Sequence, residues 1–255
     1  MTDKKITNIS CVLIAKNAES TIAQVLNALT SFRDVVLYSN NSTDATDAIA
    51  STYENVNVVQ GEFLGFGQTK NMAASYAQNS WVLSLDADEV LSDAFVDTLQ
   101  NIHLESQNVY SILRENYYKK NPIKHCWGND TIIRLYNKEK TSFSDKKVHE
   151  YVESDDFNVL ALKGIVKHYP YATITDFIIK LDRYSTIFAE ENVGKKSSSP
   201  LKAVLNAKFS FFKTYILKRG FLDGYAGLVI AFSHMATNFY KYIKLYELNQ
   251  ELKTK

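Results

Sequence analysis

The N-terminal third of the chain alternates between short apolar runs and stretches with helical spacing. Four apolar runs have the length and composition of buried strands: Ile9–Ala15, Asp34–Ser39, Asn55–Val59 and Trp81–Leu85. The spacing predicts helices between them, after Ser20, over Asp44–Ser51 and in the segment FGQTKNMAASYAQ. Strands that alternate with helices through short connections predict a parallel sheet wound by right-handed crossovers.

The alternation ends beyond Ser92. One more predicted helix, Ala94–Ile102, precedes β-rich segments that favour the edge of a mixed sheet: VYSILRENYY, TIIRLYNK and LKGIVKHY. After Pro170 helical spacing takes over, behind a capping box formed by Thr173 and Asp176. The segment KKSSSP is typical of a linker, and two more helical segments follow it. We therefore expect an α/β fold with a C-terminal helical extension at residues 171–255.

Composition and charge narrow the classes of protein. The 255 residues are 45% hydrophobic, enough for a substantial core, and the net charge of +1 argues against nucleic acid as a partner. Cys11 and Cys126 have no paired spacing, which favours a reducing compartment. The N-terminus lacks a secretory signal, and the longest uncharged stretch, Gly224–Tyr240, is too short and polar to span a membrane. We expect a cytoplasmic protein.

Three carboxylates follow the fourth apolar run, at Asp86, Asp88 and Glu89. Ligands of parallel sheets bind beyond the carboxyl ends of the strands. If the backbone stays extended, the side chains of Asp86 and Asp88 lie on the same side of the strand. A divalent metal bound between them would compensate their mutual repulsion. Oxygen ligands favour Mg²⁺ or Mn²⁺. The alternative is an acidic loop before a helix, with Ser92 as its N-cap and Asp93 favoured by the helix dipole.

The order of four segments resembles the inverting glycosyltransferases of family 2, which have the GT-A fold: ISCVLIAKN, VVLYSNNSTDAT, GFGQTKN and WVLSLDADE. The segments KVHEY, VKHYPY and RGFLDGYAG extend the resemblance over the whole chain. Together they are similar to the bacterial subgroup that adds glucose to the first inner-core heptose of lipopolysaccharide or lipooligosaccharide. The resemblance implies a GT-A catalytic domain at residues 1–170, with a donor-binding half at 1–105 and an acceptor half at 106–170.

The resemblance also implies the parts of the site. The donor would be a UDP-hexose whose diphosphate meets Mg²⁺ or Mn²⁺ held by Asp86 and Asp88, with His168 completing the metal shell. Glu150 would be the general base that takes the proton of the acceptor hydroxyl. The residues implied at the donor are Asn17, Glu19, Ser39, Asn41, Asp44, Lys70, Asp86 and Arg134.

Some of these residues depart from the family pattern or have a simpler explanation. Relatives commonly carry an Asp at the end of the second strand, where this chain has Ser39, Asn40 and Asn41. Asp44 also fits the N-cap of a helix, and Lys70 also fits a solvated helical lysine. His149 would only position its neighbour Glu150.

The segment from Pro200 to Arg219 has a composition of its own. It holds five basic residues and no acidic one, interleaved with aromatic side chains. This pattern favours a helix in an anionic membrane interface. Together with the resemblance, it implies a peripheral protein on the inner face of the inner membrane and a lipid-linked saccharide acceptor. The alternative is an ordinary packed helix with snorkelling lysines.

Other functions remain open from the residues. The string DADEV also fits the motif of haloacid-dehalogenase-type phosphatases, although that fold places it on the opening strand and needs a later paired-Asp motif. A protein that binds sugar nucleotides without turnover is a further alternative, as is a transferase acting on a polyprenyl-linked or capsular glycan. Glucose and galactose pockets differ by single hydroxyl partners, so the sequence selects neither, and it indicates no oligomeric state.

Overall fold

The computed structural model describes residues 4–145 and 150–254, which form two compact units. The first unit comprises the chain up to Glu115 and the segment Asn129–His168. The second comprises Asn116–Gly128 and the chain from Tyr169 onward. Asn116–Gly128 lies inside the expected acceptor half at 106–170, yet it groups with the helices.

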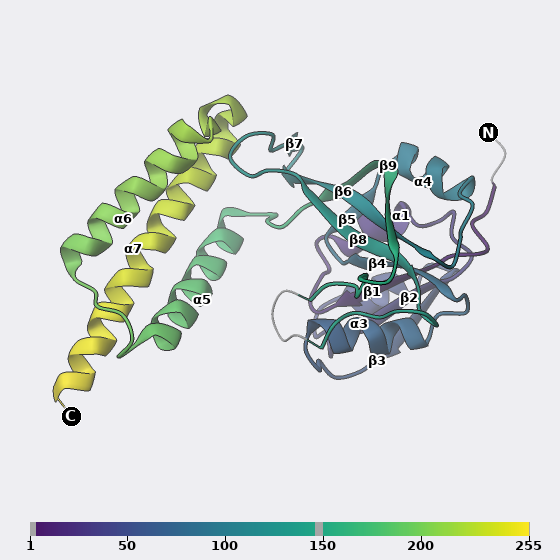
Figure 1. Cartoon of the computed structure of the whole chain (residues 1–255), viewed down its shortest axis with the longest axis horizontal. Coiled ribbons are helices and arrows are strands. Elements are labelled where there is room, and N and C mark those ends of the chain that lie inside the picture. Colours follow the sequence, from purple (N-terminus) through teal and green to yellow (C-terminus); the bar gives the residue numbers. More distant parts are fainter. Residues whose placement is uncertain (1–3, 146–149, 255) are drawn as a thin grey trace. The chain divides into compact units, whose positions relative to one another are not determined.

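The N-terminal half of the sheet is parallel. Its strands lie in the order β3-β2-β1-β4 (Figure 1). Their bounds are β1 Ser10–Ala15, β2 Val35–Ser39, β3 Val56–Gln60 and β4 Trp81–Asp86. The connecting helices are α1 Ile22–Asn27, α2 Thr46–Ala50 and α3 Phe66–Ser75. Every residue of β1 and β2 is buried, which explains why these strands are continuous apolar runs without alternation.

The rest of the sheet is antiparallel. Strand β8 (Asp130–Asn137) pairs with both β4 and β6 (Asn108–Tyr118), and β9 (Asn158–His168) pairs with β5 (Glu89–Leu91). Helix α4 (Asp93–Gln100) packs on β9, and Ser92 caps it by accepting the N–H of Phe95. The predicted mixed α/β sheet with a C-terminal helical extension is therefore confirmed.

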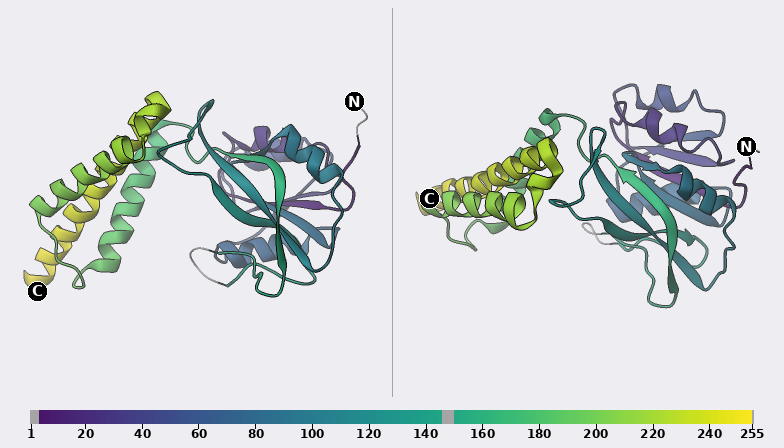
Figure 2. Two further views of the ribbon diagram at one scale, coloured as in Figure 1. Left: turned by 45° about the horizontal axis from the view of Figure 1, so that its top comes forward. Right: turned by 90° about the horizontal axis from the view of Figure 1, so that it is seen from above.

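The second unit is a layer of three helices, shown side by side in Figure 2. Helices α5 (Ile174–Asn192) and α6 (Pro200–Phe212) both pack against α7 (Gly224–Thr254). A π-helical turn η1 (Lys213–Leu217) and a 3₁₀ helix η2 (Gly220–Asp223) join α6 to α7. The predicted capping box of Thr173 and Asp176 is present at the start of α5.

The backbone of the segment Asn116–Gly128 is bound by a carboxylate of this unit. It carries the short strand β7 (Asn121–Pro122), and Asp223 accepts the backbone N–H groups of Lys124, His125 and Cys126 at 2.8–3.1 Å. Among the described residues, no helix combines the length and apolarity needed to cross a bilayer.

Candidate functional site

The loops after β1 and β2 are joined by predicted site residues. Asn17 Oδ1 accepts the N–H of Thr43 at 2.8 Å, and Glu19 Oε2 accepts the N–H of Ala45 at 3.1 Å. In the other direction, Asp44 Oδ2 accepts the N–H of Glu19 at 3.1 Å. These side chains hold the two loops together at the carboxyl edge of the parallel strands, where a ligand of this sheet would bind.

Asp44 does not occupy the expected N-cap position. Helix α2 begins at Thr46 with Ala45 as its N-cap, and Asp44 instead accepts the Thr46 N–H at 3.0 Å. Although burial opposes it, hydrogen bonding from Thr46 and Glu19 lowers the pKa of Asp44. The carboxylate therefore stays charged at the edge of the sheet while it stabilises both loops.

The end of β2 offers an acceptor that the sequence reasoning did not assign. Ser39 is buried and its hydroxyl donates to Ser42, while Asn41 takes a left-handed backbone conformation with φ 53° that asparagine tolerates. Between them, Asn40 is buried, and its Oδ1 has no hydrogen-bond partner within the described part of the chain. A buried amide oxygen without a partner is costly, so a donor group on a ligand would stabilise it.

Four predicted residues from distant segments meet beyond the end of β4. Lys70 Nζ lies 2.9 Å from Asp86 Oδ1 and 3.0 Å from Glu150 Oε1. Arg134 Nη2 lies 2.9 Å from Asp86 Oδ2. Lys70 is only 1% exposed, so the alternative of a solvated helical lysine is wrong. The structure thus places the buried Lys70 between two carboxylates and pairs Arg134 with the other oxygen of Asp86.

The charges of this cluster decide the state of Asp86. Burial by itself would raise the pKa of Asp86, but Arg134 and Lys70 outweigh it and hold that pKa well below its ordinary value. Likewise, burial would lower the pKa of Arg134, but Asp86 and Glu89 raise it. Both partners therefore remain ionised at neutral pH.

Glu89 and Arg114 were missed as members of the cluster. Glu89 is fully buried, and its Oε1 lies 2.9 Å from Arg114 Nη1 and 3.7 Å from Arg134 Nη2. Its Oε2 accepts the backbone N–H of Asp86 at 2.9 Å. Glu89 therefore fixes the end of β4 and orients both arginines. One sequence signal could have indicated this role. Glu89 directly precedes two apolar residues, which predicts burial, and two predicted β-rich segments each carry an arginine that could pair with it.

The geometry expected for Asp86 and Asp88 is wrong, because the backbone does not stay extended. Strand β4 ends at Asp86, and Ala87 and Asp88 form a turn before β5. Asp88 Oδ2 instead lies 3.6 Å from His168 Nε2, at the end of β9. In residues 4–145 and 150–254, no group of three or more histidine, cysteine, aspartate or glutamate side chains is placed to hold a metal ion.

The chemistry of these side chains nevertheless suits a divalent cation. Asp88 and His168 supply a carboxylate and an imidazole, and the Asp88 side chain is 32% exposed. Each oxygen of Asp86 receives one cationic partner, and a carboxylate oxygen has two lone-pair positions, so Asp86 retains acceptor capacity. Asp86, Asp88 and His168 therefore offer donor atoms of a suitable type, although within residues 4–145 and 150–254 the three are not arranged as a metal site.

Glu150 is positioned by a close contact between α3 and its own loop. Phe143 and Val152 form an isolated antiparallel bridge, and a Cβ at Gly67 would lie 2.1 Å from Ser144 O and 3.5 Å from the Glu150 Cβ. Only glycine allows α3 to approach so closely. His149 and the rest of KVH lie outside the described residues.

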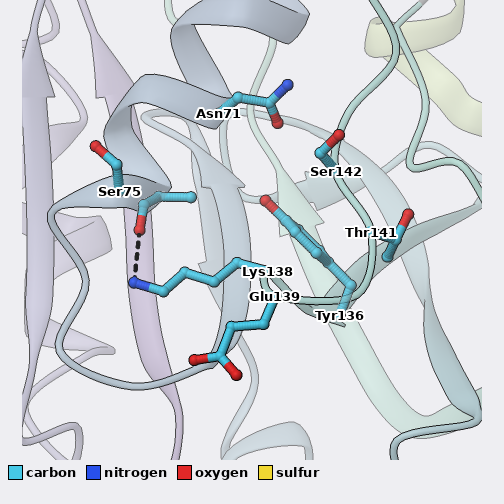
Figure 3. A pocket seen from close by; sticks show the side chains of 8 residues that line it. Asn71, Ser75, Tyr136, Lys138, Glu139, Thr141 and Ser142 are labelled. Carbon is cyan, nitrogen blue, oxygen red and sulfur yellow. Dashed lines mark hydrogen bonds between the residues drawn. The ribbon is translucent and has the colours of Figure 1, made fainter.

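A cavity of about 430 Å³ lies near this cluster and contains none of the predicted residues (Figure 3). Tyr136 lines it between Asn71 and Thr141, and its hydroxyl is buried without a partner in the described chain. The Tyr136 ring contacts Phe143 edge-on at 5.7 Å, and Phe143 lies 5.2 Å below Lys70 Nζ. The cavity thus adjoins the charged cluster through one aromatic side chain.

The family model for glycosyl transferase family 2 matches residues 10–156, more than half of the chain. The chain belongs to this family. It is therefore a transferase, and the phosphatase alternative does not stand. The matched region contains the four parallel strands, Lys70, the Asp86 cluster and Glu150.

Curated relatives support the same family. An uncharacterized glycosyltransferase of Rickettsia typhi is 31% identical over 94% of this chain and 87% of the relative, and one of Rickettsia prowazekii is 30% identical over the same shares. The lipopolysaccharide core biosynthesis glycosyltransferase LpsC of Rhizobium meliloti is 22% identical over 88% of this chain and 89% of the relative.

Solved structures with similar folds are more distant. The S. aureus protein TarS in complex with UDP has a TM-score of 0.41 at 17% identity, covering 97% of this chain and 91% of that one. The mannosyltransferase PcManGT of Pyrobaculum calidifontis, in complex with GDP-Man and Mn²⁺, has a TM-score of 0.48 at 11% identity, covering 91% and 73%. At these scores neither structure identifies a ligand of this chain.

Proposed function

We propose that this family 2 glycosyltransferase transfers a hexose from a UDP-sugar, with inversion, to an inner-core heptose of lipopolysaccharide or lipooligosaccharide. The observation that carries the catalytic part is the meeting of Lys70, Asp86, Arg134 and Glu150 beyond β4. The similarity to LpsC, a lipopolysaccharide core enzyme by its name, supports the choice of acceptor over a polyprenyl-linked or capsular glycan.

The cationic side of the cluster suits the donor. Lys70 and Arg134 are both buried and held in ion pairs, so a diphosphate at the strand ends would meet side chains that have little freedom to move away. The loops held together by Asn17, Glu19 and Asp44 would enclose the nucleoside, and Asn40 Oδ1 would accept a hydrogen bond from the base. The diphosphate would thus meet two cations that carboxylates already hold in place, and the base would supply the partner that Asn40 Oδ1 lacks in the described chain.

The metal and the base have separate places in this proposal. Asp88, His168 and Asp86 would hold Mg²⁺ or Mn²⁺, which when bound stabilises the negative charge of the leaving UDP. Glu150 would accept the proton of the acceptor hydroxyl, with Lys70 as its counter-ion at 3.0 Å. Glu150 would remove this proton while the hydroxyl oxygen attacks the anomeric carbon from the side opposite to UDP, and this single displacement inverts the configuration.

Titration calorimetry with UDP tests the donor and metal assignments. We expect the wild-type protein to bind UDP at least about tenfold more tightly with Mn²⁺ than with EDTA, a difference of about 1.4 kcal/mol. GDP is the control nucleotide, since the proposal requires preference for uracil. Equal UDP affinity with and without Mn²⁺ would remove the metal from the proposal. Tight binding of UDP-hexoses without any transfer or hydrolysis would instead favour a sugar-nucleotide-binding protein without turnover.

The helical unit supports the predicted membrane surface as a partner. Helix α6 and the turn after it expose large apolar side chains at helical spacing, while the small residues Ala203 and Ala207 are buried. We call the exposed set the apolar stripe: Leu201, Leu205, Phe209, Phe212 and Ile216. The helix therefore exposes its large apolar side chains and buries its small ones. Together with five basic residues and no acidic one between Pro200 and Arg219, this pattern fits an anionic bilayer interface. We propose that the stripe holds the enzyme on the inner face of the inner membrane, where a lipid-linked acceptor would be.

Vesicle flotation tests the apolar stripe. Phe209→Ser should weaken binding to vesicles of phosphatidylcholine and phosphatidylglycerol by about tenfold, because a large apolar side chain contributes about 1.5–3 kcal/mol when buried. Phe63→Ser is the matched control, since Phe63 is similarly exposed at 52% against 59% but lies in the first unit. Equal losses in both variants, or no flotation of the wild type, would contradict the membrane assignment.

A further inference from the structure

A second cavity lies within the helical unit, where α6 and the π-helical turn η1 meet α7. Its volume is about 260 Å³, below the range of about 300–1,000 Å³ typical of sites for drug-sized ligands. Serine, threonine, asparagine, histidine and lysine line it, and no carboxylate does. The cavity therefore has the size and lining of a site for a small anion.

Three lysines give the cavity its charge: Lys213, Lys218 and Lys241. Within the described residues none of them forms an ion pair, whereas Lys244, one turn further along α7, pairs with Asp182 at 2.7 Å. Asp223, the acidic residue nearest in sequence to η1, is already bound to three backbone N–H groups of residues 124–126. Like charges around one cavity repel, so an anion between them would lower the free energy of the unit.

The backbone of η1 brings two of these lysines to the same place. The N–H of Lys218 donates to the carbonyl of Lys213 at 2.9 Å, which is the wider i to i+5 turn of a π-helix. Such turns are rare in proteins as a whole, and those that occur are often found at functional sites. Both lysines are exposed, so neither is required for the packing of α6 on α7.

A buried polar network fixes a hydrogen-bond donor beside the lysines. The indole N–H of Trp127 donates to His234 Nε2 at 3.3 Å, so the proton of a neutral ring lies on Nδ1, 3.0 Å from Thr214 Oγ1. Burial, aided by Lys218 and Lys241, lowers the pKa of His234 to about 4, which keeps this ring neutral. Thr214 therefore accepts from His234, and its own hydroxyl hydrogen remains available to a ligand.

We propose that this cavity binds a phosphate group, held by the ammonium groups of Lys213, Lys218 and Lys241 and by the hydroxyl of Thr214. Lysine is a common phosphate ligand, and three cations without a carboxylate match the charge of a phosphate better than that of a sugar or a carboxylic acid. The phosphate comes either from a lipid headgroup or from a soluble phosphate compound, which share this chemistry. This proposal depends only on the residues that line the cavity, and it requires neither the proposed sugar transfer nor membrane binding.

The first arm of the test uses inorganic phosphate and the full chain. Calorimetric titration at constant ionic strength should show binding to the wild type, and Lys213→Gln and Lys241→Gln should each weaken it by about tenfold. Lys208→Gln is the matched control, because it removes the same charge from α6 outside the cavity and should leave the affinity unchanged. No binding to the wild type, or equal losses in all three variants, would overturn the proposal.

The second arm identifies the source of the phosphate. If it is a lipid headgroup, inorganic phosphate should release the protein from vesicles containing phosphatidylglycerol, and Lys213→Gln should reduce flotation more than Lys208→Gln, which removes one charge from the interface but none from the cavity. If it is a soluble compound, flotation should be the same for both variants and insensitive to phosphate, although calorimetry still shows lysine-dependent binding. If the protein binds phosphate but neither floats with vesicles nor transfers sugar, the phosphate site is supported. The same result contradicts the proposals of membrane binding and of sugar transfer.

Discussion

Glu150→Gln should reduce kcat for hexosyl transfer by about 10²–10⁴-fold, the contribution typical of a positioned general base. Glutamine has nearly the same size, and its amide oxygen can still accept a hydrogen bond from Lys70, which lies 3.0 Å from Glu150 Oε1. It cannot take a proton from the acceptor hydroxyl. The measurement is transfer from a radiolabelled UDP-hexose to a truncated lipid acceptor, beside calorimetry with UDP.

The pattern of kcat and binding separates catalysis from donor binding. Because Lys70 and Arg134 keep Asp86 as a partner, the variant should bind UDP nearly as tightly as the wild type. Glu153→Gln is the control, since Glu153 is an exposed carboxylate three residues away and should have little effect. Unchanged kcat in Glu150→Gln would remove this residue as the base, and an equal loss of UDP binding would show that it acts on the donor instead.

Asp88→Ala should abolish turnover and weaken the Mn²⁺-dependent part of UDP binding by about 10- to 100-fold or more, since residues that only support a metal ligand already contribute that much. Asp88 lies in the turn after β4, forms no ion pair with the buried cations of the described chain, and faces His168 at 3.6 Å. Its loss should therefore leave the folded cluster of Lys70, Asp86 and Arg134 intact. Calorimetry with UDP at several Mn²⁺ concentrations measures the effect.

Two comparisons make this prediction specific to the metal. His168→Ala should give the same dependence on Mn²⁺ concentration, because both side chains are assigned to one cation. Asp97→Ala removes an exposed carboxylate from α4 and should change neither binding nor turnover. UDP affinity in Asp88→Ala that still rises with Mn²⁺ as in the wild type would exclude Asp88 as a ligand.

The local elements were predictable because short-range physics determines them. The apolar runs at β1, β2 and β4 are buried on both faces, so their composition alone identifies them as central strands. The capping box of Thr173 and Asp176 and the N-cap at Ser92 follow from residues three positions apart. The fold class could therefore be predicted from these local patterns, whereas the family was inferred from the resemblance of the motifs.

The site was predictable only in part. Lys70, Asp86, Arg134 and Glu150 were named from the family resemblance, and the structure brings them within hydrogen-bond distance of one another. The expected sharing of one side by Asp86 and Asp88 failed because the strand ends at Asp86, two residues too early for alternation to reach Asp88. Glu89 was not assigned to the cluster because its partner Arg114 is 25 residues away on β6, and only the order β6-β9-β5 in the sheet brings the two together.

The sequence by itself determined the main strands and helices of this glycosyltransferase and their order, because these depend on neighbours in the chain, but the short strands β5 and β7 were not predicted. Tertiary structure alone decided which charges are buried and paired: Lys70 between two carboxylates, Glu89 beneath two arginines, and Asp88 beside His168. The physical reason is that desolvation and Coulomb energies depend on distances between side chains, and pairing of β4, β8, β6, β9 and β5 sets those distances.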